Sequence, residues 1–313
     1  MMGYLLAAIL VVLVLGLSYG CYWVAFYNPE SRHKEAVVTG VSRRNVKQEA
    51  LNEKMERTPY ERVSIRSEDG LLLSARYYHL RDGAPLHIQF HGYRGSGVRD
   101  FSAGNDVVRR AGYNTLVVDQ RAHGLSQGNT MTFGILERYD CLAWAHYALQ
   151  RFGPETAVFL SGVSMGAATV LMASNLDLPG NVVGIIGDCP YSSPRGIIRK
   201  ICRDIHIPWA LVSPFMTLGA LVFGRFRLGQ ESAVSAVKEA KIPVLLIHGK
   251  EDRYILPEMS EQIRSNCASE CYLEIFPGAG HGGSCLTDTP RYEKVVRSFC
   301  GICLDRWEAR KEE

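Results

Sequence analysis

The sequence lacks a strong charge of either sign, an internal repeat and a low-complexity tract. Its 35 Lys and Arg residues nearly balance its 32 Asp and Glu residues, so the 313-residue chain carries a net charge of +3. This mild charge allows a weak attraction to anionic lipid at most. Because basic and aromatic residues are not interleaved either, the composition argues against a nucleic-acid partner.

The chain also lacks the cysteine pattern of a disulfide-stabilised protein. Nine cysteines are an odd number, and their spacings are irregular, which is typical of reduced thiols. The pair Cys300 and Cys303 forms a C-x-x-C within an expected terminal helix. Without a second pair or a histidine partner, this motif does not predict a zinc or redox site.

Charged side chains are absent from residues 1–29. The apolar run 4–26 is long enough to cross a hydrocarbon core as a helix, and Tyr22, Trp23 and Tyr27 stand where an interfacial aromatic belt would lie. We therefore expect residues 1–29 to be a transmembrane anchor. A cleaved signal peptide is the alternative, with small residues at Ser18 and Gly20 for cleavage, although no basic residue precedes the apolar run.

The residues after the apolar run are polar and basic. Arg32, Lys34, Arg43, Arg44 and Lys47 follow it while no basic residue precedes it, so the positive-inside rule predicts a cytoplasmic location for the rest of the chain. Residues 30–58 are expected to form a charged linker or helical stalk. Residues 59–313 remain, and a segment of roughly 250 residues can bury a substantial core as one domain.

That domain begins with two strand patterns, 60–66 and 71–78, joined by a turn that contains Asp69-Gly70. Further strand patterns alternate with helical ones, which predicts an α/β fold with a mainly parallel sheet covered by helices on both faces. Helices are expected near residues 100–111, 136–152, 165–175, 257–268 and 290–308.

Gly162-Val163-Ser164-Met165-Gly166 lies between an apolar strand pattern and a helix of small residues. A serine at such a turn, with glycine two places to either side, is typical of a nucleophile elbow, in which tight packing holds the serine in a strained conformation. The amide of Met165 would then lie at a helix N-terminus, facing a developing oxyanion. The alternative is that Ser164 is an ordinary helix N-cap.

Two partners for this serine follow later strands in the order that a catalytic triad on such a sheet requires. Asp252 comes just after the strand pattern 242–249, and His281 comes after the pattern 271–276 within a glycine-rich loop. We expect His281 to act as the base and Asp252 to orient it. Asp188 and Asp119, which also end strands, are alternatives for the acid. The histidines that compete with His281 are His91, His123 and His248.

The strand pattern 86–90 runs into His91-Gly92-Tyr93. In hydrolases with this chain order, the loop after the corresponding strand contributes an amide to the oxyanion hole, and Tyr93 occupies that position. The expected oxyanion hole therefore consists of the amides of Tyr93 and Met165. A plain glycine-rich turn is the alternative.

About 50 residues separate the strand patterns that end at Asp188 and begin at Ile242, far more than a connection needs. They contain two apolar runs, 205–212 and 215–223. These predict a cap that binds an acyl chain or leans on a bilayer, or else helices that pack on the core. Basic residues flank the runs at positions 195, 199, 200, 203, 225 and 227.

Taken together, six motifs resemble the alpha/beta-hydrolase superfamily, near its serine aminopeptidase-like and acyl-hydrolase-like branches. They lie at residues 91–93, 119–126, 162–167, 188–192, 248–252 and 280–282. The resemblance covers about residues 60–308 and departs from the usual Arg-Gly-His at Gln120-Arg121-Ala122-His123. It implies an eight-stranded, mainly parallel sheet with a helical cap insertion at about 190–240, and a serine hydrolase that needs no cofactor or metal.

The expected function is that of a membrane-anchored serine hydrolase acting on a small-molecule carboxylic ester or thioester through an acyl-enzyme. An aminopeptidase is the alternative within enzymes. It would need an acidic group to bind the substrate's amino terminus, and the cap offers only Asp204, Glu231 and Glu239. A hydrolase fold kept as a non-catalytic binding protein is the alternative outside enzymes, although such a protein need not retain all three triad residues.

Overall fold

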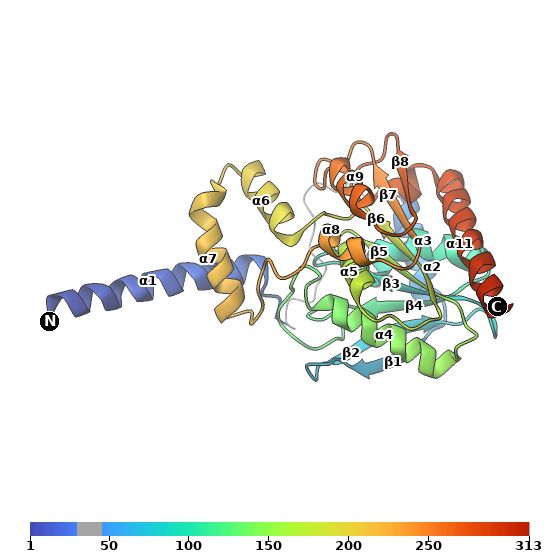
Figure 1. Cartoon of the computed structure of the whole chain (residues 1–313), viewed down its shortest axis with the longest axis horizontal. Helices are drawn as coiled ribbons and strands as arrows, with labels where there is room; N and C mark the ends of the chain where they lie inside the picture. Colours follow the sequence, from blue (N-terminus) through green and yellow to red (C-terminus); the bar gives the residue numbers. More distant parts are fainter. Residues whose placement is uncertain (30–45, 313) are drawn as a thin grey trace.

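The structure, a computed structural model, describes residues 1–29 and 46–312 (Figure 1). It begins with the long apolar helix α1 (Met2–Ala25), as expected, and continues after the gap with helix α2 (Val46–Arg57). Four of the basic residues used to predict the orientation, Arg32, Lys34, Arg43 and Arg44, lie outside the described residues, as does the first half of the expected linker.

The core of the protein is an eight-stranded sheet with the strand order β1-β2-β4-β3-β5-β6-β7-β8. Only β2 pairs with its neighbours in antiparallel fashion, and all other neighbours are parallel, so the expected mainly parallel sheet is confirmed. The strands are β1 (Glu61–Arg66), β2 (Leu72–Tyr78), β3 (Leu86–Phe90), β4 (Asn114–Asp119), β5 (Val158–Val163), β6 (Val182–Asp188), β7 (Val244–Gly249) and β8 (Cys271–Phe276).

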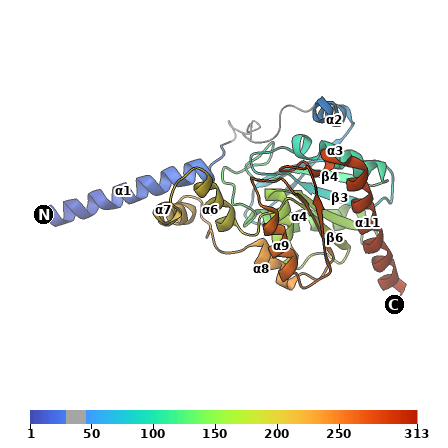
Figure 2. The ribbon, with the colours of Figure 1, turned by 90° about the horizontal axis from the view of Figure 1, so that it is seen from above.

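Helices cover both faces of the sheet (Figure 2). Because side chains alternate along a strand, Val158 and Leu160 of β5 join one hydrophobic cluster and Phe159 joins the other. The first cluster lies under α4 (Glu137–Phe152), α5 (Met165–Met172) and α9 (Pro257–Asn266). The second lies under α3 (Gly97–Arg110) and α11 (Thr289–Glu312). Short helices complete the two layers: η2 (Ala173–Asn175), α8 (Ala233–Ala236), η3 (Val237–Glu239) and α10 (Ser284–Thr287).

The long connection between β6 and β7 contains two further helices, α6 (Pro194–Asp204) and α7 (Trp209–Val222), which form the cap. The cap lies at the end of the molecule from which α1 projects (Figure 1). Helix α7 packs directly on α1: a Cβ atom on Gly219 would overlap the carbonyl oxygen of Ser18, and the rings of Tyr19 and Phe223 lie 5.1 Å apart.

The last turns of α1 are part of the globular domain. Phe26 is fully buried, and its ring lies 5.7 Å from Phe133 and 5.1 Å from Phe226. Tyr22 shares a 2.8 Å hydrogen bond with the hydroxyl of Thr130, and the Asn28 amide donates to the carbonyl of Ala122. The anchor candidate therefore ends inside the hydrophobic core and not in a free tether.

The second half of the expected linker is helix α2, which packs on α3 (Figure 2). Met55 is its one buried residue and joins Tyr78 and Val117 in a small apolar cluster. The Gln48 amide donates 2.7 Å to the hydroxyl of Ser102 on α3. A helix of mainly polar composition is thus held to the domain by one apolar side chain and a few polar contacts.

An ion-pair network around the buried Arg121 joins three segments of the domain. The guanidinium of Arg121, in the loop after β4, donates two hydrogen bonds of 2.6 and 2.7 Å to Asp140 on α4. It donates a third, of 2.9 Å, to Asp69 in the turn between β1 and β2. Burial raises the pKa of Asp140 to about 6 in spite of its bonds to Arg121.

Replacing one partner of this pair should therefore destabilise the domain strongly. We expect Arg121→Met to lower the free energy of unfolding by about 3–5 kcal/mol, because it leaves the Asp140 carboxyl buried without a charge partner. Chemical unfolding of the detergent-solubilised chain measures this. The double variant Arg121→Met/Asp140→Leu should regain most of the loss, and a double variant no more stable than the single one would contradict the explanation.

Candidate active site

Ser164 lies in the turn between β5 and α5 and has φ 56° and ψ −114°, a conformation that non-glycine residues rarely adopt. Close packing imposes this strain. A Cβ atom on Gly166 would overlap the carbonyl of Phe90 in β3, and one on Gly162 would overlap the backbone of Gly166. The Ser164 hydroxyl does not bond the first turn of α5, so the N-cap alternative is wrong.

The structure brings Ser164, His281 and Asp252 together at the carboxyl ends of β5, β8 and β7. The Nε2 atom of His281 lies 3.0 Å from the Ser164 Oγ, and its Nδ1 atom lies 2.7 Å from Oδ2 of Asp252. An ionised carboxylate only accepts hydrogen bonds, so Nδ1 carries the proton and Nε2 accepts from the serine hydroxyl. This is the geometry of a nucleophile beside its base, with the base oriented by an acid.

Asp252 is held in its charged form. Burial works to raise the pKa of its carboxyl, but hydrogen bonds with His248 and His281 outweigh this and hold the pKa below its usual range. The other carboxylate oxygen accepts from the amides of Tyr254 and Ile255, both at 2.9 Å. The acid is thus ionised and fixed in place at neutral pH.

Asp188 and Asp119, the alternative acids, form no hydrogen bond or ion pair with His281. The carboxyl of Asp188 is buried, which raises its pKa to about 6, and its Oδ1 atom has no hydrogen-bond partner among the described residues. Its backbone carbonyl instead accepts from the Ser164 amide at 2.8 Å. Asp119 accepts from the amide of Leu125 at 3.1 Å, as a residue that shapes the turn after β4.

The three competing histidines each have other partners. His91 accepts from the amide of Gln120 at 3.2 Å, and His123 accepts from the amide of Arg94 at 3.1 Å, so both brace loops. His248 is fully buried and donates through Nε2 to the carbonyl of Ile255 at 2.9 Å, with Oδ2 of Asp252 only 3.4 Å from the same nitrogen. His248 therefore supports the acid, a role that its sequence pattern did not indicate.

Two main-chain amides beside Ser164 are free to bind a substrate oxygen. In the loop after β3, the amides of Gly92 and Arg94 donate to Asp100 and His123, at 2.7 and 3.1 Å. Among the described residues, neither the amide of Tyr93 nor that of Met165 has an acceptor. A Cβ atom on Gly92 would lie 3.4 Å from the Cβ of Ser164, so this loop borders the serine. Both amides expected in the oxyanion hole are available.

The end of α1 binds the same loop, which no sequence motif indicated. The hydroxyl of Tyr93 donates to the carbonyl of Ala25 at 2.9 Å, and the guanidinium of Arg94 donates to the carbonyl of Val24 at 3.0 Å. These carbonyls belong to the last turn of a helix and lack intrahelical partners. Burial raises the pKa of Tyr93 to about 12, so its hydroxyl stays a donor.

The cap contacts the other side of the site. The ammonium of Lys200 on α6 bonds the carbonyl of Arg253 and the carboxylate of Asp204. The neighbouring Tyr254 ring lies 5.0 Å from the His281 ring in an edge-on arrangement. The loop that holds Asp252 is thus packed between the cap and the catalytic histidine candidate.

Cys189 follows β6 and lies behind this site. Its sulfur, a carboxylate oxygen of Asp252 and a ring nitrogen of His281 all lie within 4.8 Å of one another, as metal ligands could. Burial raises the pKa of the Cys189 thiol well above its usual value, so the sulfur stays protonated at neutral pH and is a poor ligand. The other two groups are already bonded to each other.

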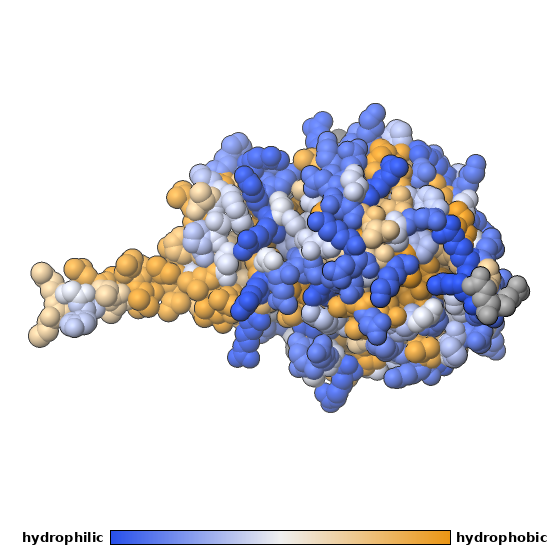
Figure 3. Space-filling model, viewed as in Figure 1, coloured by the Kyte–Doolittle hydropathy of each residue, from blue (hydrophilic) through white to orange (hydrophobic). Residues whose placement is uncertain are grey.

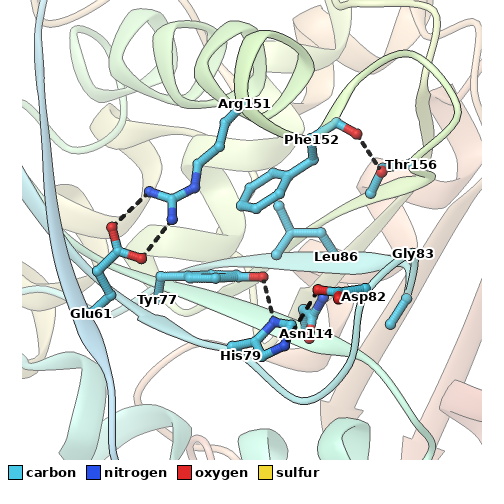
Figure 4. Close-up of a pocket in the computed structure, with 11 residues that line it drawn as sticks. Glu61, Tyr77, His79, Asp82, Gly83, Leu86, Asn114, Arg151, Phe152 and Thr156 are labelled. Atoms are coloured by element: carbon cyan, nitrogen blue, oxygen red, sulfur yellow. Dashed lines mark hydrogen bonds and ion pairs between the residues drawn. The ribbon is translucent and has the colours of Figure 1, made fainter.

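A cavity of about 480 Å³ lies far from these residues (Figure 4). Leu86, Asn114 and Thr156 line it at the start of β3, at the start of β4 and just before β5. Because the triad candidates lie at the carboxyl ends of parallel strands, this cavity is at the opposite edge of the sheet. Its wall includes the ion pair between Arg151 and Glu61, at 2.5 Å.

Comparisons with known proteins bear on the fold that carries these residues. A family model described as serine aminopeptidase, S33, matches residues 87–218. A search of curated proteins finds an uncharacterized protein of Bacillus subtilis, YqkD, 26% identical over 199 residues, which are 63% of this chain and 65% of that protein. The match thus spans slightly less than two thirds of the relative's length.

Solved structures are similar in fold. An esterase of Pyrococcus furiosus has a TM-score of 0.63 and 21% identity, covering 80% of this chain and 93% of that one. Est1E of Butyrivibrio proteoclasticus, solved with ferulic acid bound, has a TM-score of 0.59 and 20% identity, covering 78% of this chain and 99% of its own. At this level of identity the likeness concerns the fold alone.

The different contacts of Asp252 and Asp188 predict that the same change to Asn slows the reaction strongly at Asp252 and little at Asp188. Asp252→Asn should slow hydrolysis of p-nitrophenyl acetate by roughly 10⁴-fold in kcat, because the amide cannot hold His281 in the required tautomer. Asp188→Asn, which removes a carboxyl that makes no hydrogen bond to His281, should stay within about tenfold of the original rate. Steady-state kinetics of both variants check this, and the reverse ranking would assign the acid to Asp188.

Proposed function

This chain has the alpha/beta-hydrolase fold, and from that premise we propose that it is a serine hydrolase that cleaves carboxylic esters or thioesters. One observation carries the proposal. The Ser164 hydroxyl lies 3.0 Å from a histidine nitrogen whose opposite nitrogen is bonded to a buried, ionised carboxylate. The amides of Tyr93 and Met165, which have no acceptor within residues 1–29 and 46–312, lie on segments that border the same serine.

The reaction would proceed in two steps. Ser164 Oγ attacks the carbonyl carbon while His281 Nε2 accepts the hydroxyl proton, and the amides of Tyr93 and Met165 bind the negative oxygen. Collapse of this intermediate breaks the bond to the alcohol or thiol, which takes the proton from His281. Water then attacks the acyl-serine with His281 again as base, and the acid product and free Ser164 result. Asp252 stabilises the imidazolium in both steps.

The contacts of the cap's acidic residues favour esters over peptides. An aminopeptidase must offer a carboxylate to the substrate's ammonium group. Asp204 is bonded to Lys200, and Glu231 accepts from Arg138 at 2.7 Å and from Asn175 at 2.9 Å. Glu239 is exposed on η3, which packs on η2 and α9 rather than on the triad. The similar structures named as esterases support the same choice.

We further propose that α1 is a retained membrane anchor. Helix α1 is 24 residues long and strongly apolar, and only 6% of its most apolar window is buried in the protein. Cleavage after Gly20 would remove Ser18 and Tyr19, which pack on α7, and would leave the core residues Tyr22 and Phe26 without the helix that positions them. These contacts favour an anchor over a cleaved signal sequence.

The catalytic proposal is tested with a fluorophosphonate probe, which reacts only with an activated serine. The purified chain should be labelled, and Ser164→Ala should abolish labelling because the attacking oxygen is gone. Hydrolysis of p-nitrophenyl acyl esters should exceed that of aminoacyl p-nitroanilides. Faster turnover of the anilides would point to an aminopeptidase, and a chain that neither reacts with the probe nor hydrolyses any substrate would be a non-catalytic binding protein.

The anchor proposal is tested by extraction and intact mass. The chain should stay in the membrane pellet after an alkaline carbonate wash, and its mass should include residues 1–20. In sealed right-side-out vesicles, external protease should leave the hydrolase domain intact if that domain faces the cytoplasm. A soluble chain that begins near residue 21 would instead identify a signal sequence.

A further inference from the structure

Helix α7 exposes a continuous apolar face. Leu211, Leu221 and Val222 are 67%, 49% and 46% exposed, and Pro214 and Leu218 share their face at the spacing i, i+3, i+7, i+10 and i+11. The helix contains no charged residue. Ile205 and Ile207, just before it, are also exposed. The hydrophobic surface of α1 continues onto this part of the cap (Figure 3), which marks a binding face.

The orientation of α7 relative to α1 indicates what covers that face. The two helices are in contact at Gly219 and Ser18. Helix α7 crosses α1 steeply in Figure 1 and is seen nearly end-on in Figure 2. When α1 crosses a bilayer, α7 therefore lies along the plane of that bilayer, as an interfacial helix does.

The length of α1 places α7 at the depth of the lipid. Residues 2–17 are exposed apart from the half-buried Val14, and at Ser18 the helix enters the contact with α7. These 16 free residues span about 24 Å at 1.5 Å per residue, whereas a hydrocarbon core is about 30 Å thick. The shortfall of about 6 Å equals roughly the radius of a helix. Helix α7 lies against α1 where this free stretch ends, so the remaining thickness of the bilayer must extend over α7. A bilayer crossed by α1 therefore reaches the apolar face of α7.

Exposed arginines flank α7 on both sides in the chain. Arg195, Arg199 and Arg203 are exposed on α6, and Arg225 and Arg227 are exposed just after α7. None of the five forms an ion pair with any residue that the structure describes. Guanidinium groups bind phosphate through paired N–H donors, and juxtamembrane cations of this kind favour anionic lipid.

The cap and α1 also contact the two sides of the site. On one side, the Ala25 carbonyl of α1 accepts a hydrogen bond from the hydroxyl of Tyr93, whose amide belongs to the proposed oxyanion hole. On the other side, Lys200 of α6 donates a hydrogen bond to the loop that holds Asp252. We propose that α7 lies in the interface of an anionic phospholipid bilayer, and that the substrate is a long-chain acyl ester dissolved in that bilayer. The second half of this inference rests on the proposed esterase function.

The bilayer contact is tested without any assay of activity. Trp209 packs against the hydrophobic core and Trp23 belongs to α1, so the probe is Leu211→Trp, on the exposed face, in the Trp23→Phe/Trp209→Phe chain. This chain is reconstituted into phosphatidylcholine and phosphatidylglycerol vesicles with brominated acyl chains. We expect a loss of emission from the introduced tryptophan, defined as the difference from Trp23→Phe/Trp209→Phe. Emission equal to that in unbrominated vesicles would overturn the contact. Adding Ser164→Ala should leave the quenching of tryptophan emission unchanged, so this result does not depend on catalysis.

The substrate is tested with a pair of charge variants. Leu211→Glu/Leu221→Glu should slow hydrolysis of a long-chain p-nitrophenyl ester in vesicles by about tenfold or more, because charge on this face opposes immersion. Hydrolysis of water-soluble p-nitrophenyl acetate should stay within about twofold. Leu80→Glu, at the opposite edge of the sheet and 41% exposed, should change neither rate.

The remaining outcomes separate the two proposals. If Leu211→Glu/Leu221→Glu leaves the rate on the long-chain ester unchanged, or lowers the rates on both esters equally, the proposal that the substrate lies in the bilayer would be overturned. No hydrolysis of either ester by the parent chain would overturn the esterase function and leave the quenching result standing. Replacing phosphatidylglycerol by phosphatidylcholine should lower the long-chain rate, and Arg199→Gln/Arg203→Gln should reduce that dependence. A rate independent of lipid charge would contradict the role of the arginines.

Discussion

The close approach of α5 to β3 is the constraint on which the rest of the site depends. It exists because Gly166 has no side chain to separate the helix from the Phe90 carbonyl, and Gly162 removes the matching obstacle on β5. This packing holds Ser164 at a positive φ angle, at a cost of about 1–3 kcal/mol that the surrounding core supplies. It also directs the serine hydroxyl away from the helix and toward His281, and it turns the Met165 amide toward the same space.

The two acids near the histidine show how environment assigns roles. Asp188 ends β6 and Asp252 lies in the loop after the adjacent strand β7, and both are buried. Asp252 receives two backbone amides and two histidine contacts, which lower the pKa of its carboxyl, whereas burial raises the pKa of Asp188 to about 6. Opposite shifts in neighbouring carboxyls are a general means of giving them different functions. Asp252, which accepts more hydrogen bonds and therefore stays ionised, is the acid that can orient His281.

Much of this arrangement follows from the sequence because carboxyl ends of parallel strands meet at one edge of a sheet. Strand patterns that end near Ser164, Asp252 and His281 were sufficient to predict their proximity. Two features had no such pattern. His248 supports Asp252 through a contact made only after the loop folds back, and α2 packs on α3 although its composition is that of a linker, since only Met55 is buried. Such contacts depend on tertiary packing and leave no local periodicity.

Helix α1 joins these observations, because it is both the membrane candidate and a part of the site. Its final carbonyls need donors from outside the helix, and the loop that carries the Tyr93 amide provides them through Tyr93 and Arg94. A displacement of α1 would therefore move the loop that carries the Tyr93 amide. Because α7 packs on the same helix, the depth of α1 in a bilayer sets the depth of the cap as well. Under the proposals made above, the position of α1 in a membrane and the geometry of the Tyr93 amide are coupled, which is expected when the proposed substrate itself lies in the bilayer.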